Sequence, residues 1–82
     1  MRTREEIFDS LRRHLEEMFE VPPEAIRLEA ELYKDLDLDS LDAVDLIVKL
    51  QEITGRKIPP ADFKTVRTVG DVVDRVHALL AA

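Results

Sequence analysis

The sequence predicts an all-α fold, a small four-helix bundle of three main helices and one short helix, with a long first loop. Three segments carry apolar residues at three-and-four spacing, the pattern of a helix with one buried face. No segment of useful length alternates with the period of two that a half-buried strand would show. Because 82 residues suit one small domain, we expect residues 1–82 to share a single core.

We expect the first helix over about residues 4–19. Thr3 precedes it and Glu6 follows three residues later, which is the spacing of a capping box between a hydroxyl and a carboxylate. Pro22 and Pro23 end this helix, because proline lacks an amide hydrogen and disfavours helical geometry before it. The apolar residues at helical spacing are Ile7, Phe8, Leu11, Leu15, Met18 and Phe19.

Residues 20–39 form a connection that is long for so small a domain. Such a loop usually packs through its own side chains or has a function. Apolar residues are spread along it, so we expect it to pack on the helices. They are Ile26, Leu28, Leu32, Leu36 and Leu38.

The second helix should begin at Asp39 or Ser40 and end at Gly55, a residue that readily adopts the left-handed conformation. On a helical wheel this segment has two apolar faces and an acidic flank between them. One face holds Leu46, Ile47, Leu50 and Ile53, the opposite face holds Leu41, Val44 and Val48, and the flank holds Asp42, Asp45, Lys49 and Glu52. The second face is either exposed for a partner or buried beneath the 20–39 loop, and we favour exposure.

A short helical turn is expected from Pro60 to about Lys64, with Pro60 suited to the first helical position. Thr68 followed by Asp71 again has the spacing of a helix N-cap and an acid three residues later. The last helix then carries an apolar stripe of Val69, Val72, Val73, Val76 and Leu80.

The net charge of −6 is concentrated in the middle of the chain. Residues 29–54 hold two basic and eight acidic residues, whereas residues 55–82 hold five basic and three acidic residues. This distribution argues against nucleic-acid binding and favours partners with basic docking patches. The sequence shows neither a membrane-spanning apolar run nor a secretory signal, so we expect a cytoplasmic protein without membrane insertion. We also expect it to be a monomer.

Five aspartates lie between residues 35 and 45, and the first three match the start of a calcium-binding EF-hand loop. That loop needs glycine at its sixth position and a bidentate glutamate at its twelfth. Those positions are Ser40 and Leu46. We therefore predict no metal site.

The chain also has little equipment for catalysis. It has no cysteine, and its two histidines, His14 and His77, lie on the first and last predicted helices rather than near Ser40. Its two glycines, Gly55 and Gly70, cannot form a phosphate-binding loop. We expect a protein that is not an enzyme and has no catalytic residues.

The segment Asp39-Ser40-Leu41-Asp42, with Leu36 before it and Val44-Asp45-Leu46 after it, resembles the attachment motif of acyl carrier proteins. The resemblance covers nearly the whole chain, including the acidic helical layout, Gly55, Ile58-Pro59 and Thr68-Val69-Gly70-Asp71. It implies that the Ser40 hydroxyl accepts a 4′-phosphopantetheine arm from coenzyme A through a phosphopantetheinyl transferase. The alternative for Ser40 alone is a simple capping residue.

The resemblance also implies an acyl carrier that delivers thioesters to acyl-loading and acyl-transfer or synthase enzymes of a fatty-acid, specialised lipid or polyketide pathway. A partner-recognition surface would contain Asp39, Leu41, Asp42, Val44, Asp45, Val48 and Glu52. An acyl cavity would be lined by Phe8, Leu32, Leu46, Ile47, Leu50, Ile58, Phe63, Val66, Val69, Val72 and Val73.

Three departures from the family pattern bear on partner choice. Asp37 replaces a usual glycine, and Thr54 replaces a usual aromatic residue. Lys49 adds positive charge to a helix that is usually more acidic, and Arg56 and Lys57 add more just after that helix. The alternative function is an unmodified helical interaction module that regulates or scaffolds a partner protein.

Overall fold

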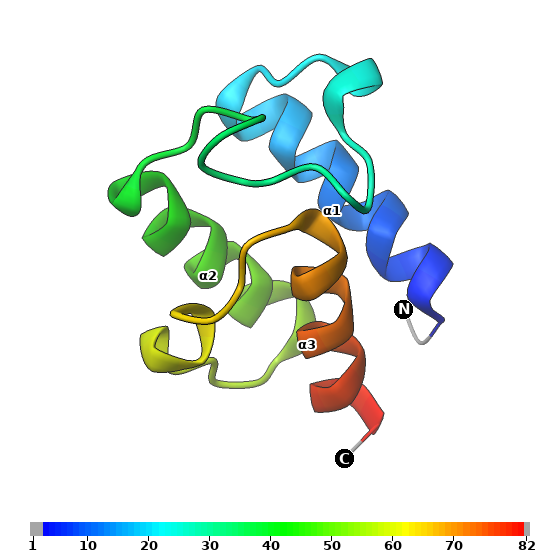
Figure 1. Cartoon of the computed structure of the whole chain (residues 1–82). Coiled ribbons are helices and arrows are strands. Elements are labelled where there is room, and N and C mark those ends of the chain that lie inside the picture. Colours follow the sequence, from blue (N-terminus) through cyan, green and yellow to red (C-terminus); the bar gives the residue numbers. More distant parts are fainter. Residues whose placement is uncertain (1–2, 82) are drawn as a thin grey trace.

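The computed structural model describes residues 3–81, which form three α-helices joined by long irregular segments (Figure 1). The helices are α1 (Arg4–Phe19), α2 (Ser40–Thr54) and α3 (Val69–Ala81), and the connections contain two one-turn 3-10 helices, η1 (Pro23–Ala25) and η2 (Pro60–Phe63). No strand occurs within the described range, where an isolated bridge pairs Glu31 with Thr68. The all-α class and the three main helices are confirmed. The short helix expected at 60–64 is a 3-10 turn, so the count of four helices stays a prediction.

The ends of α1 follow from local chemistry. The Glu6 amide donates to the Thr3 hydroxyl at 3.1 Å, and the Thr3 amide donates to the Glu6 carboxylate at 3.2 Å, so the predicted capping box is present. Glu20 ends the helix in the left-handed conformation, with φ of 55°. Ile7, Leu11 and Leu15 are buried and form the inner stripe that the spacing predicted.

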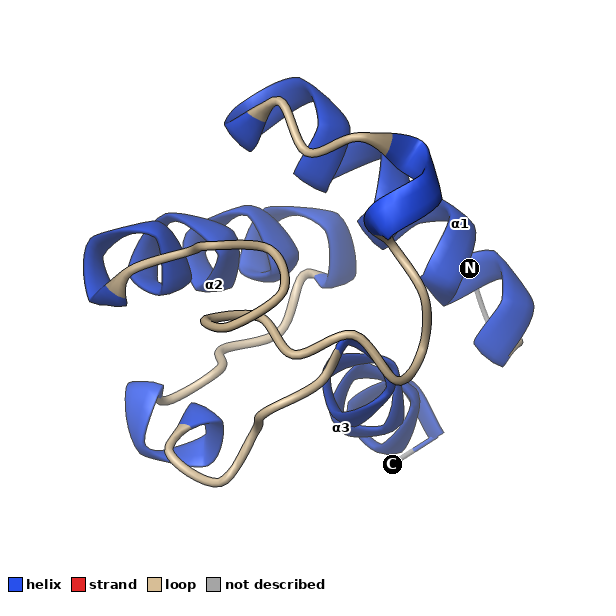
Figure 2. Ribbon diagram, turned by 45° about the horizontal axis from the view of Figure 1, so that its top comes forward, coloured by secondary structure: helices blue, strands red, loops and turns tan. Residues whose placement is uncertain are grey.

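The long loop is fixed by the amino-terminal end of α3. The amides of Val69 and Gly70, which have no partner within the helix, donate to the carbonyls of Ala30 and Leu28 at 3.0 and 2.8 Å. Figure 2 shows the segment after η1 passing the end of α3 before it returns to α2. The expectation that the loop packs is confirmed except at Leu28, whose side chain is 47% exposed. Leu28 holds the loop through its carbonyl instead.

The Thr68–Asp71 cap is also confirmed. The Asp71 amide donates to the Thr68 hydroxyl, and the Thr68 amide donates to the Asp71 carboxylate, both at 3.1 Å. The carboxylate accepts a second amide, that of Arg67, and these backbone hydrogen bonds hold the pKa of Asp71 below its ordinary value. The cap and the loop carbonyls together account for how α3 begins.

All three α-helices and the loop contribute to one apolar core. Among the described residues, no polar or charged side chain belongs to the buried set. Within residues 3–81, no helix is long and apolar enough to cross a membrane.

Candidate functional site

Ser40 is the first residue of α2, and its side chain is exposed. The helix is capped by its neighbours: the Asp42 amide donates to the Asp39 carboxylate at 2.9 Å, and the Asp39 amide donates to the Asp42 carboxylate at 3.2 Å. The Ser40 hydroxyl makes no hydrogen bond to any residue in the described range. It is therefore available for modification, and Asp39 is the cap.

The first turn of α2 suits an attached phosphate. Amides at a helix start lack intrahelical acceptors, and the helix dipole places partial positive charge there. The Asp39–Asp42 box occupies the amide of Asp42, whereas the amides of Ser40 and Leu41 donate to no residue in the described range. An exposed hydroxyl at this position fits a phosphodiester, which is the linkage of a phosphopantetheine arm.

Ser40 is continuous with an exposed apolar stripe on α2. Leu41 is 74% exposed, and Val44 and Val48 are about half exposed, at 49% and 48%. The loop does not cover this face, so the alternative in which both faces of the helix are buried is wrong. The opposite face faces the core through Leu46, Ile47 and Leu50, whereas Ile53 is only half-buried.

The acidic residues of the expected recognition surface lie beside this stripe. Asp39, Asp45 and Glu52 are exposed and Asp42 is half-buried. Lys49 lies 3.8 Å from the Glu52 carboxylate and offsets part of its charge. The surface near Ser40 thus combines the apolar stripe of α2 with negatively charged side chains beside it.

The residues expected to line an acyl cavity form the centre of the core. Leu32, Leu46, Ile47, Leu50, Ile58, Phe63, Val66, Val69, Val72 and Val73 are buried, and Phe8 is half-buried at the edge of the cluster. An open cleft of about 570 Å³ beside Phe8 and Val73 is also lined by Leu28. Whether this core opens for an acyl chain stays a prediction.

Two residues of the long loop add to what the sequence indicated: Tyr33, which was assigned no role, and Asp37, which was noted only as a departure from the family pattern. Tyr33, in the loop, is 49% exposed. The only feature of the sequence that could have indicated it is that an aromatic residue stands in an otherwise acidic stretch. Asp37 has φ of 57°, a left-handed conformation that glycine adopts freely and aspartate tolerates. That geometry explains why glycine is usual at this position.

The aspartates do not converge on one point. Within the described range, no group of three or more histidine, aspartate or glutamate side chains is arranged to hold a metal ion. The structure therefore places these carboxylates as separate charges along a surface.

Comparison with known proteins agrees with this geometry. Residues 9–76 match the family model described as phosphopantetheine attachment site. The chain is 54% identical over 80 residues to acyl carrier protein 2 of Ralstonia nicotianae, covering 98% of this chain and 99% of that protein. It is 38% identical over 77 residues to the acyl carrier protein of Coprothermobacter proteolyticus, covering 94% of each. It is 39% identical over 77 residues to the meromycolate extension acyl carrier protein of Mycolicibacterium smegmatis, covering 94% of this chain and 78% of that one.

Proposed function

We propose that Ser40 is the residue to which phosphopantetheine is attached, because the chain belongs to the acyl carrier protein family. Members of this family use phosphopantetheine and are carriers rather than enzymes. The observation that carries the proposal is the exposed Ser40 hydroxyl at the first turn of α2, left free because Asp39 and Asp42 cap the helix. When bound, the arm supplies the thiol that this cysteine-free sequence lacks.

The residues around Ser40 would each have a defined role. The amides of the first turn would favour the phosphate charge at the helix start. Leu41, Val44 and Val48 would provide apolar contact area to an enzyme that addresses Ser40. Asp45 and Glu52 would raise the rate of encounter with a basic docking patch, because charges at the rim of an interface act mainly on association.

We also propose that the core shelters the acyl chain. Its buried set contains no polar side chain within the described range, so an aliphatic chain would lie among apolar side chains there. The 3-10 helix η2 takes the place of the short helix of the four-helix arrangement. We propose that the protein is a cytoplasmic monomer that serves a fatty-acid, specialised lipid or polyketide pathway. An acidic surface suits such a carrier, because it meets several enzymes in turn.

Intact-mass measurement tests the attachment residue. The protein is incubated with coenzyme A and a broad-specificity phosphopantetheinyl transferase, and we expect a gain of one phosphopantetheinyl group. Ser40→Ala should abolish the gain, and Ser10→Ala is the matched control because Ser10 is the other serine in the sequence. Circular dichroism confirms that both variants fold.

The opposite results would be informative. Modification of Ser40→Ala would place the arm elsewhere. An unmodified natural sequence, under conditions that modify a control carrier, would favour the interaction module instead.

A further inference from the structure

A groove beside the attachment residue is formed by the end of α1, the long loop and the start of α2, and we call it the α1–α2 groove. Its volume is about 480 Å³, within the range of roughly 300–1,000 Å³ for pockets that hold small organic ligands. Leu38 and Asp42, which stand two residues before and after Ser40, both line it. Since consecutive Cα atoms are about 3.8 Å apart, the Cα of Ser40 lies within about 7.6 Å of each of theirs. Figure 1 shows the end of α1 and the start of α2 on the same side of the molecule.

The wall of the α1–α2 groove is mostly apolar, and the remaining lining residues are acidic. Six of its ten lining residues have apolar side chains, and the other four are glutamate or aspartate. An apolar wall with a few polar groups is typical of sites that bind small molecules. The carboxylates would repel an anion, so the groove suits a neutral chain. The apolar lining residues are Phe19, Val21, Pro22, Ala25, Leu36 and Leu38.

The acidic side chains of the groove keep acceptor oxygens for a ligand. The Glu20 and Asp37 carboxylates make no hydrogen bond or ion pair with a residue in the described range. Asp35 and Asp42 each use one carboxylate oxygen to accept a backbone amide, at 2.8 and 3.2 Å. An ionised carboxylate offers about four acceptor sites, so these oxygens can also accept amide and hydroxyl hydrogens of a bound molecule.

The backbone beside the groove has an uncommon conformation. Among the described residues other than glycine, Glu20 and Asp37 have positive φ, at 55° and 57°, and both line the groove. This conformation costs a residue with a side chain more energy than it costs glycine, and it is concentrated at sites that hold ligands. Glu20 ends α1, whereas Asp37 lies in the loop and ends no helix.

We propose that the α1–α2 groove holds the phosphopantetheine arm of Ser40 while the thiol of the arm carries no acyl chain. The proposal rests on the proposed function, since it supposes an arm at Ser40. Beyond its phosphate the arm is neutral, so its methyl and methylene groups would pack on the apolar wall and its amide and hydroxyl hydrogens would bond to the carboxylates. The phosphate would stay at the start of α2. Because the arm is tethered, its effective concentration at a neighbouring site is of millimolar order, and weak contacts are enough to hold it.

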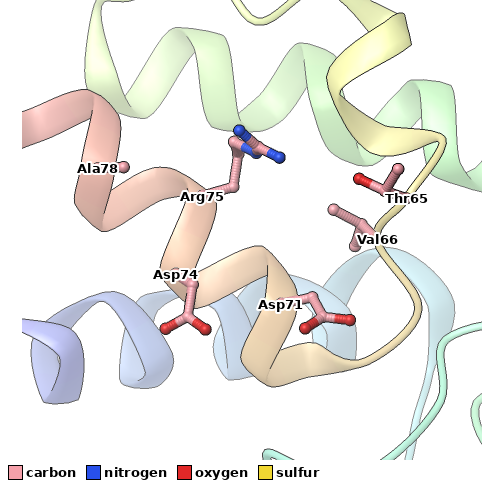
Figure 3. Close-up of a pocket in the computed structure, with 6 residues that line it drawn as sticks. All are labelled: Thr65, Val66, Asp71, Asp74, Arg75 and Ala78. Carbon is pink, nitrogen blue, oxygen red and sulfur yellow. The ribbon is translucent and has the colours of Figure 1, made fainter.

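Two other hollows suit the arm less well. The cleft beside Phe8 lies near the start of α1, and Phe8 is eleven residues, or about 16 Å of helix axis, before Phe19. The groove at the start of α3 is smaller, at about 270 Å³, and Figure 3 shows carboxylates and the Arg75 guanidinium around it. Among the described residues, α2 contributes Asp42 to the α1–α2 groove and none of its exposed stripe. An arm held there therefore leaves the stripe open to a partner.

Nuclear magnetic resonance tests the contact directly. An isotope-labelled chain is modified at Ser40 with an unlabelled arm and reduced, so that the thiol is free. Isotope-filtered Overhauser contacts are then recorded from the methyl protons of the arm. We expect contacts to side chains of the apolar wall, which are Phe19, Val21 and Leu36.

A bulky side chain placed in the groove tests the same point. Ala25→Phe narrows the α1–α2 groove and should remove most of the amide shift changes that modification causes at residues 19–21 and 35–38. Ala78→Phe is the matched control, because Ala78 lines the groove at the start of α3 (Figure 3), and it should leave those changes in place. Circular dichroism checks that both variants fold, and the Overhauser contacts of the natural sequence test the proposal without either variant.

Two results would overturn the proposal. Shift changes confined to the residues next to Ser40, without Overhauser contacts to the groove, would place the arm in solvent. Contacts to Leu46 and Val69 instead would place it in the core. Intact mass is measured first: a chain that gains no arm, or gains one in Ser40→Ala, means failure of the proposed function. A chain modified at Ser40 whose arm makes no contact with the groove means failure of this proposal alone.

Discussion

Two truncations on α2 separate its buried face from its exposed face. Leu50 is 3% exposed within the core, whereas Val44 is 49% exposed on the outer stripe. Both side chains are aliphatic and both lie inside the same helix, Ser40–Thr54. Leu50→Ala and Val44→Ala therefore compare the two faces with little difference in backbone context.

The structure gives different magnitudes for the two changes. Leu50→Ala removes three buried carbon groups at about 0.8 kcal/mol each, and the cavity left behind brings the cost to about 2–5 kcal/mol. Val44→Ala removes two groups that are about half in water, a loss of about 0.8 kcal/mol, offset by roughly 0.6 kcal/mol of better helix propensity. An 82-residue domain has a total unfolding free energy of about 4–12 kcal/mol. The first change thus removes a large share of the stability and the second removes almost none.

Urea unfolding followed by far-ultraviolet circular dichroism measures both. With a denaturant slope of about 1 kcal/mol per molar for a domain of this size, Leu50→Ala should lower the midpoint by about 2 M or more. Val44→Ala should move it by less than about 0.5 M. The docked complex with a phosphopantetheinyl transferase should nevertheless dissociate faster for Val44→Ala, because apolar contact is lost. If Val44→Ala unfolds at the same urea concentration as Leu50→Ala, the stripe is core and the docking argument fails.

Three further predictions concern charge. Asp45→Lys should slow association with a transferase and flatten its dependence on salt, measured by stopped flow, whereas Glu24→Lys on η1 makes the same charge change away from α2 and should not. Calcium should bind weakly and raise the melting temperature by relieving repulsion among carboxylates, and submicromolar affinity in calorimetry would contradict this. Burial, followed by the charge of Lys49, lowers the pKa of His14 below 6.5, with Arg13 adding to and Glu17 opposing the shift. The unfolded chain then takes up the proton first, so stability should fall as pH drops below about 6.5 toward the folded pKa. Denaturation at several pH values should show a smaller fall in His14→Gln, and an equal fall would refute the assignment.

The helices could be predicted because their signals are local. Thr3 with Glu6 and Thr68 with Asp71 each place a capping side chain and its partner three residues apart, and both pairs form the expected hydrogen bonds. Asp39 and Asp42 have the same spacing and also form a capping box, although their pairing was not predicted. The buried stripes follow from the 3.6-residue period. These features depend on residues within one turn of each other, so the order of residue types is sufficient.

The path of the long loop could not be predicted in the same way. Its position depends on the carbonyls of Leu28 and Ala30, which accept amides of α3 about forty residues later. Every residue type has a carbonyl, so the sequence contains no sign of this pairing. Leu28 was therefore expected in the core, although the structure needs its backbone and leaves its side chain half in water.

The candidate site was predicted more completely than its partners because modification requires one exposed hydroxyl, whereas docking requires a surface. Ser40 and the stripe on α2 lie within nine residues of sequence. The enzyme that docks on this stripe lies outside the sequence, so the residues of α2 predict where a partner would dock but not which partner it is.

Asp39 and Asp42 connect the fold to the docking surface. Each carboxylate accepts a backbone amide at the start of α2, and each also contributes negative charge beside Ser40. Replacing either by alanine removes a cap contributing about 0.5–2 kcal/mol together with a charge, so a loss of docking in such a variant has two causes. Asp45 is exposed and takes no part in the capping box, and its replacement therefore changes the charge alone. The part that charge plays in partner recognition is thus measured at Asp45, and the aspartates nearest Ser40 are interpreted only after their cost to the helix is known.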